Sequence, residues 1–408
     1  MQAPLRDNTH AKAYVRMTIH KNIKLLSWLN FFTDFKLYAP VAIIYFAQVT
    51  GSYALGMSIF SVSMIASALL EIPTGVFSDM VGRRKTVLLG SLSAIAYSVF
   101  YAIGGSFWML AAGAVLDGLS QAFYSGNNDA LLHDSLSESK NEHRYDEYLG
   151  KISSMFQAAL AISAIAGSIL AQWSFPLIMW LSVIPQILCF VLAYRLTEPS
   201  VHKNESGNIY VHLRDAVRNF ITNKQLRLLS VSSVFGYGFG EASYQFQSAF
   251  YNTVWPVWAI GIAKTLSNLG GLISFHFSGK LLRRYKALHI LVADNLYCRT
   301  VNTIATVFPG ILSPVLMSTT SLFYGVTSVA RSTLMQKEFT QGQRATMGSL
   351  NSFAGSLFFG VVAFLIGFAA DKVSPGRALL ILQGFMLANL FVYWKLFKHQ
   401  KSVSVNPS

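Results

Sequence analysis

The sequence is poor in charged residues and in cysteine. Asp, Glu, Lys and Arg make up 12% of its 408 residues, whereas hydrophobic residues make up 53%, and the mean hydropathy is +0.43. A chain of this composition has too little polar surface to fold as a soluble globule, so a membrane protein is expected. Cys189 and Cys298 lie in separate apolar runs, which argues against a disulfide framework or a metal site.

The sequence also lacks the spacings that mark common catalytic and cofactor sites. It shows no Ser-His-Asp pattern, no phosphate-binding loop and no zinc-ligand spacing. The glycines of 236–240 lie inside an apolar run without the preceding strand that a nucleotide fold requires, so they favour helix bending or close packing instead. We therefore expect neither enzyme activity nor a cofactor.

Long apolar runs dominate what remains. Twelve runs are each long enough to cross about 30 Å of hydrocarbon at about 1.5 Å per residue. They cover approximately residues 25–48, 54–77, 86–104, 107–127, 150–172, 175–195, 227–250, 257–278, 287–308, 312–335, 346–370 and 378–397. The sequence therefore predicts an all-α membrane protein with twelve transmembrane helices.

The formal charge of +14 is explained by topology and not by a nucleic-acid partner. Lys and Arg gather in alternate connections, above all before residue 25, at 83–85, in 195–227 and in 280–286. Positive residues remain on the cytoplasmic side of membrane proteins. We expect a multi-pass protein of the cell membrane, inner or plasma, with both termini in the cytoplasm and the lipid bilayer as its surroundings.

Two halves of the chain share a motif. Phe77, Ser78, Arg83 and Arg84 recur 200 residues later as Phe277, Ser278, Arg283 and Arg284. Duplicated halves are typical of transporters. We predict an N-terminal bundle at 1–195, a cytoplasmic linker at 196–226 and a C-terminal bundle at 227–408. The linker ends in an amphipathic stretch, 210–223, interpreted as an interfacial helix, with an unstructured hinge as the alternative.

The stretch Gly75-x-Phe77-Ser78-Asp79-x-x-Gly82-Arg83-Arg84-Lys85 resembles the loop 2–3 signature of the major facilitator superfamily. The resemblance implies two pseudo-symmetric six-helix bundles that exchange access to a central cavity. It also implies a conformational-switch loop, in which Asp79 docks at the start of helix 11, near 344–346, in the outward-facing state. A carboxylate is stabilising at a helix N-terminus, and Gly82 is expected to form the turn. Met80 replaces the basic residue usual in the family.

The helix 4 exit, Ser125 to Leu136, resembles that of a poorly characterised bacterial branch that is often labelled efflux. Two other patterns of the family are missing. Ala114 replaces the arginine of many proton-coupled relatives, and helix 5 has no Gly-Pro pair. These departures weaken a drug-antiporter assignment.

In this superfamily helices 1, 4, 7 and 10 line the cavity, and each matching run carries polar residues spaced by three or four along one helix face. The candidates for a substrate or proton site are Asp34, Tyr38, Asp117, Gln121, Tyr237, Glu241, Tyr244, Gln245, Tyr324 and Arg331.

Asp34, Asp117 and Glu241 are predicted near the midplane, where a charge costs several kcal/mol unless it is paired or faces water. We interpret them as candidates for proton coupling, with Glu241 first. The alternative is a permanent ion pair of Asp34 or Asp117 with Lys36 or Arg331. Other intramembrane charges lie outside the four cavity helices and are expected to pair structurally or to gate: Glu71, Lys264, Asp294 and Arg299.

The sequence thus predicts a monomeric secondary transporter that exchanges a small amphipathic or cationic organic solute for protons, in the efflux direction. Aromatic residues near the acidic candidates favour that solute class. The first alternative is a proton-coupled symporter that takes up a nutrient, since Lys36 and Arg331 also suit a zwitterion or an organic anion. The alternative from another class is a membrane sensor or assembly factor that transports nothing.

Overall fold

The computed structural model describes residues 8–138, 141–198, 218, 220–338 and 344–405, and every regular element in these ranges is a helix. The N-terminal elements are α1 (Asn8–Asp34), the 3₁₀ helix η1 (Ala39–Val41), α2 (Ala42–Thr50), α3 (Tyr53–Val81), α4 (Arg83–Ile103), α5 (Phe107–Tyr124), α6 (Asn127–Glu138), η2 (Glu142–Arg144), α7 (Tyr145–Ala171) and α8 (Phe175–Arg195). The C-terminal elements are α10 (Lys224–Val254), α11 (Val257–Arg284), α12 (Ala287–Val307), α13 (Ser313–Ser318), η3 (Thr319–Phe323), α14 (Tyr324–Gln336), α15 (Arg344–Lys372), α16 (Pro375–Met386) and α17 (Ala388–Val405).

Six described segments are long and apolar enough to cross a membrane. They are Tyr53–Val81, Arg83–Ile103, Glu147–Ala171, Phe175–Arg195, Met347–Lys372 and Pro375–Lys398. The count of twelve spans therefore stays a prediction. Two of the expected continuous spans, 25–48 and 312–335, are each interrupted by a short 3₁₀ helix in the described chain.

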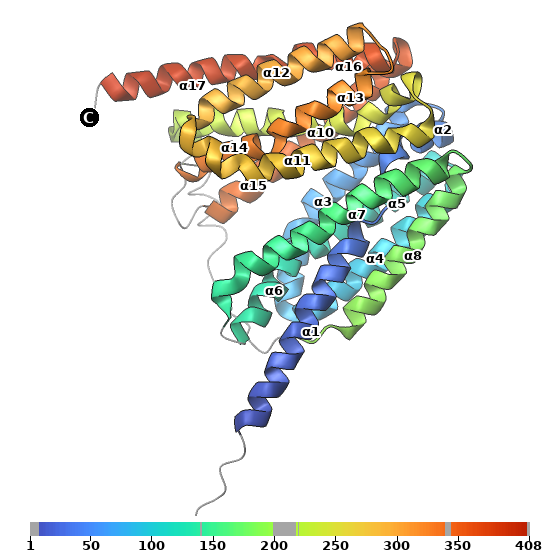
Figure 1. The fold of residues 1–408 in the computed structure, drawn as a ribbon, viewed down its shortest axis with the longest axis vertical. Coiled ribbons are helices and arrows are strands. Elements are labelled where there is room, and N and C mark those ends of the chain that lie inside the picture. Colours follow the sequence, from blue (N-terminus) through green and yellow to red (C-terminus); the bar gives the residue numbers. More distant parts are fainter. Residues whose placement is uncertain (1–7, 139–140, 199–217, 219, 339–343, 406–408) are drawn as a thin grey trace, which may run out of the picture.

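The helices form two groups that meet at one end and diverge at the other (Figure 1). Elements α1 to α8 pack mainly on one another, and so do α10 to α17. The main contacts between the groups join α3 with α15, α7 with α11 and α2 with α10. The expected linker at 196–226 lies largely outside the described residues, so the proposed domain boundaries stay a prediction.

The break in the first expected helix follows from Pro40. Proline has no N–H for the helical hydrogen bond, and its ring clashes with the carbonyl four residues earlier, here that of Lys36. The chain accordingly leaves the α1 helix after Asp34. Polar groups of α8 satisfy the freed backbone, as the Ser182 hydroxyl lies 3.1 Å from the Leu37 N–H and the Gln186 amide donates to the Phe32 carbonyl at 3.3 Å.

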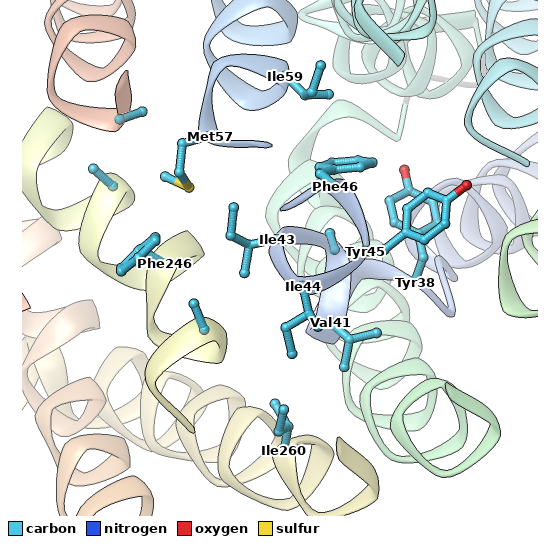
Figure 2. Close-up of a cluster of buried hydrophobic side chains, with 14 of the residues drawn as sticks. Tyr38, Val41, Ile43, Ile44, Tyr45, Phe46, Met57, Ile59, Phe246 and Ile260 are labelled. Atoms are coloured by element: carbon cyan, nitrogen blue, oxygen red, sulfur yellow. The ribbon is translucent and has the colours of Figure 1, made fainter. Parts of the chain in front are cut away.

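Apolar side chains seal the end where the two groups meet, which we call the Ser52 side. Figure 2 shows Ile43 and Met57 of the N-terminal group near Phe246 of the C-terminal group, with Ile260 of the C-terminal group below Ile44, and all five are buried. Glycines permit this close approach. A Cβ at Gly261 would collide with the Ala164 carbonyl, and one at Gly367 with the Tyr53 carbonyl.

A carboxylate from the C-terminal group also caps α3 on the Ser52 side. Asp371 accepts hydrogen bonds from the Ser52 hydroxyl at 2.6 Å and from the backbone N–H groups of Tyr53 at 2.7 Å and Ala54 at 3.0 Å. The first N–H groups of a helix have no partner within the helix, and negative charge is favourable there. Asp371 therefore links α15 to α3 where the two groups are closed.

Candidate functional site

A cavity of about 600 Å³ lies between the two groups. Its charged and amide-bearing lining residues are Asn30, Asp34, Lys36, Asp117, Gln121, Asn128, Asp129, Gln186, Gln245, Lys264 and Asn268, and its aromatic ones are Tyr38, Phe60, Tyr97, Tyr124, Tyr244 and Phe359. The lining reaches the exposed junction of α5 and α6 at Ser125 and Gly126. That junction lies at the end away from the Ser52 side, which we call the Arg83 side (Figure 1).

The structure places six of the ten predicted site residues in the cavity wall. These are Asp34, Tyr38, Asp117, Gln121, Tyr244 and Gln245. The other four, Tyr237, Glu241, Tyr324 and Arg331, are not part of the lining. Glu241 lies directly behind it, because its carboxylate accepts a 2.7 Å hydrogen bond from the Gln245 amide.

The N-terminal wall holds an ion pair. The Lys36 ammonium lies 3.6 Å from one oxygen of Asp117, and 5.1 Å from the centre of the Tyr97 ring. The other Asp117 oxygen accepts hydrogen bonds from Ser63 at 2.5 Å and Gln121 at 3.0 Å. Asp117 is only 8% exposed, so these neighbours replace the water that a charged group needs. This arrangement corresponds to the ion pair that sequence reasoning weighed as its alternative.

Asp34 has a different environment. It is the last residue of α1 and is partly exposed to the cavity. Within the described chain, its carboxylate makes no hydrogen bond and has no cationic nitrogen within 4.0 Å, and Lys36 acts on it only at longer range. Asp34 is thus a cavity carboxylate without a direct partner among the described residues.

The C-terminal wall contains Lys264, which sequence reasoning placed outside the cavity. Its ammonium donates a 2.6 Å hydrogen bond to the Tyr244 carbonyl and lies 3.8 Å from the centre of the Tyr244 ring. Lys264 lines the cavity although α11 is not one of the four helices assigned to it, because α11 packs along α7 and also touches α10. The expected role of Lys264 in structural pairing or gating stays a prediction. Lys264 and Glu241 also interact electrostatically.

The other three residues outside the lining make contacts of their own, although Tyr237 reaches the lining residue Met64. The Tyr237 hydroxyl lies 3.7 Å from the Met64 sulfur, across the two groups. Tyr324 is 65% exposed and packs on Phe275 with ring centres 5.8 Å apart. The Arg331 guanidinium lies over Gly236, where an added Cβ would be only 2.7 Å from a guanidinium nitrogen.

Two glycines of α10, Gly236 and Gly238, lie against neighbouring side chains, whereas Gly240 has no neighbour within 4 Å of its Cβ position. At Gly238 an added Cβ would meet the Phe358 ring at 2.5 Å and the Phe359 backbone nitrogen at 2.9 Å. The helix is unbroken through these glycines, and the bending expected from them stays a prediction.

The predicted conformational-switch loop forms the turn between α3 and α4. Gly82 has φ of 103°, a backbone region that favours glycine. The Glu198 carboxylate accepts hydrogen bonds from the backbone N–H groups of Arg83 at 2.7 Å and Arg84 at 2.8 Å, which caps α4. Gly75, one α3 turn before Asp79, has no neighbour within 4 Å of its Cβ position.

Asp79 pairs within its own loop, since its carboxylate lies 3.0 Å from the Arg83 guanidinium. The side chains of 344–346, where Asp79 was expected to dock, lie outside the part of the chain that the structure describes. The docking therefore stays a prediction for the outward-facing state.

Sequence reasoning gave no site role to Lys264, Tyr97, Ser63 or Glu198. A lysine inside an apolar run was the available signal for Lys264, because such a charge must be paired or face water. No local signal marks Glu198, which is 115 residues from the N–H group it caps at Arg83.

Comparison with known proteins identifies the family. The Uncharacterized transporter BU466 of Buchnera aphidicola subsp. Acyrthosiphon pisum (strain APS) is 28% identical over 171 residues, 42% of this chain and 42% of that protein. The match thus spans less than half the length of that curated relative.

Solved structures share the fold at low identity. A point mutant of the nucleoside transporter NupG gives a TM-score of 0.80 at 13% identity, covering 92% of this chain and 100% of that one. The D-xylose-proton symporter gives 0.71 at 11% identity, covering 92% and 97%. A bacterial homologue of the human lysosomal transporter Spinster, inward-facing and unoccupied, gives 0.68 at 14%, covering 96% of each chain. The model of the Major Facilitator Superfamily matches residues 25–363, so the chain belongs to this superfamily.

Proposed function

We propose that the protein is a secondary active transporter that moves a small organic solute by alternating access, with protons as the coupling ion. The observation that carries this proposal is the charged cavity between the two helix groups. The groups are joined at the Ser52 side, and the lining of the cavity includes exposed residues toward the Arg83 side. Rocking of two groups about such a central site exposes it to each side of a membrane in turn. In this state the cavity is accessible from the Arg83 side, predicted to be cytoplasmic.

Glu241 is the proposed proton carrier. Coupling needs a carboxyl group that alternates between ionised and neutral forms beside the solute. Glu241 lies behind Gln245, a cavity residue that donates to it, and its cationic neighbour Lys264 is not within 4.0 Å. Asp34 and Asp117 are the runners-up. Asp117 is the weaker of the two, because Lys36, Ser63 and Gln121 already stabilise its ionised form.

The direction of transport is part of the proposal. Efflux in exchange for protons is the first expectation and uptake with protons the second. A sensor or assembly factor remains the alternative from another class, and it would bind a solute without moving protons.

The test uses the purified protein in liposomes. Wild type and Glu241→Gln are compared in solute accumulation driven by a pH gradient and in solute exchange without a gradient. Glu241→Gln mimics the neutral carboxyl, so gradient-driven accumulation should fall to background while exchange persists. The matched control is Glu147→Gln, an exposed carboxylate of α7 outside the cavity lining, which should keep both activities.

If Glu241→Gln keeps full gradient-driven accumulation and Asp34→Asn loses it, the proton carrier is Asp34 and not Glu241. The sign of the gradient that produces accumulation distinguishes efflux from uptake.

A further inference from the structure

Only some of the charged side chains in the cavity wall form ion pairs with one another. Apart from the solvent-exposed Asp129, four charged residues line it: Asp34, Lys36 and Asp117 from the N-terminal group and Lys264 from the C-terminal group. Lys36 and Asp117 lie 3.6 Å apart and neutralise each other. Asp34 and Lys264 remain on opposite walls, each without an ion partner in contact among the described residues. Glu241, behind the lining, acts on Lys264 only at longer range.

Lys264 has donor capacity to spare. An ammonium group has three N–H donors, and one of them is used by the Tyr244 carbonyl. The residue is 5% exposed, and within the described chain no carboxylate lies within 4.0 Å of its nitrogen. A buried ammonium without an anion in contact is costly, so an anionic group of a ligand that reached it would be strongly favoured.

Asp34 favours a cationic group of a ligand. Its carboxylate lies at the C-terminal end of α1, where the helix dipole also favours a cation. Some carbonyl groups at this end are already satisfied, since Gln186 donates to that of Phe32. The Asp34 carboxylate itself has no such donor among the described residues. An ammonium group would thus gain both from the carboxylate and from the helix end.

We propose that the solute is a small zwitterion, whose carboxylate is held by Lys264 and whose ammonium is held by Asp34. This inference rests on the proposed transport function and specifies its substrate class. A purely cationic solute would leave Lys264 unpaired, and a purely anionic one would leave Asp34 unpaired. A zwitterion compensates both walls at once, and because the two groups come from different halves, it bridges them.

The neutral wall residues fit such a solute. Tyr97, Tyr124 and Tyr244 present aromatic surface, and Gln121 and Gln245 present amides. A volume of about 600 Å³ is within the range of small-molecule sites, roughly 300–1,000 Å³.

The experiment measures binding and does not depend on transport. Purified wild type is screened by thermal shift, followed by titration calorimetry, against three matched sets of probes. The first set contains zwitterions: the twenty standard amino acids, their dipeptides with alanine, and glycine betaine. The second contains the corresponding amines without the carboxylate, and the third the corresponding carboxylates without the amine. At least one zwitterion should bind at least tenfold more tightly than both of its single-charge analogues.

Variants assign the two charges. Lys264→Gln and Asp34→Asn should each weaken binding of that zwitterion about tenfold or more, and Lys264→Gln should lose its discrimination against the amine analogue. Lys264→Arg keeps the charge and should retain zwitterion preference. The control is Lys280→Gln, an exposed α11 lysine outside the cavity lining, which should bind as wild type does.

Three results would overturn the inference: no zwitterion binds, an analogue with one charge binds as tightly as its zwitterion, or folded Lys264→Gln binds the zwitterion undiminished. Because the wild-type screen is decisive alone, a variant that fails to fold leaves the test intact. If a zwitterion binds but is never transported, the transport function fails and this site stands.

Discussion

Asp371→Ala should open the Ser52 side. The substitution removes a carboxylate that accepts three hydrogen bonds from the first residues of α3, at 2.6, 2.7 and 3.0 Å. Two of these bonds are solvent-exposed, so their strength is reduced. A charge at an exposed helix N-terminus contributes about 0.3–1 kcal/mol, and hydrogen bonds to it add a similar amount. We expect a loss of about 1–2 kcal/mol from the closed form, which changes the ratio of closed to open molecules by a factor of about 5–30.

Distances between spin labels report this change. One pair replaces Trp173 and Phe308, which are exposed on the Ser52 side of the two groups, and a second replaces His143 and Tyr285, exposed on the Arg83 side. Both are placed in a chain without Cys189 and Cys298. In Asp371→Ala the first pair should gain a longer component and the second a shorter one. Lys372→Ala, a change at the next residue, is the control, and distributions identical to wild type in Asp371→Ala would refute the role of this cap.

Two further substitutions test packing and charge. Gly261→Val places a side chain against the Ala164 carbonyl, so it should hold the Ser52 side open in the same distance measurements, whereas Gly279→Val on the same helix has open space and should not; equal behaviour of the two variants would contradict the proposed close approach. Asp117→Asn leaves Lys36 without its contact partner and should lower the free energy of unfolding by about 1–3 kcal/mol, measured by denaturation in detergent, and adding Lys36→Met should recover most of the loss. A double variant no more stable than Asp117→Asn would show that the pair is not coupled.

Local patterns predicted much of this fold. Gly82 was expected to form a turn because it lies in the charged signature loop between two apolar runs, and the structure gives it a positive φ. The polar spacing of Asp34 and Tyr38, and of Asp117 and Gln121, identified residues that do line one cavity. Helical periodicity carries this information because it fixes which side chains share a face.

Contacts between distant segments were not predictable from such patterns. Lys264 enters the cavity wall because α11 packs against α10 and α7, and no periodicity within α11 specifies its neighbours. Asp371 directly follows the expected span 346–370, and nothing in the local sequence indicates that it caps a helix that begins more than 300 residues earlier. Arg331 has the sequence spacing of a cavity-facing residue along its own helix. Its guanidinium lies instead over α10, at Gly236, where no side chain occupies the space.

Proton movement caused by the solute tests the central claim most directly. Liposomes that contain the purified protein and a trapped pH indicator are given an outside solute identified by binding, without any imposed pH gradient. Transport coupled to protons predicts a change of internal pH that depends on the solute, that is abolished in Glu241→Gln and that persists in Glu147→Gln. A solute that binds and yet moves no protons in wild type would contradict the account and favour a sensor or assembly factor.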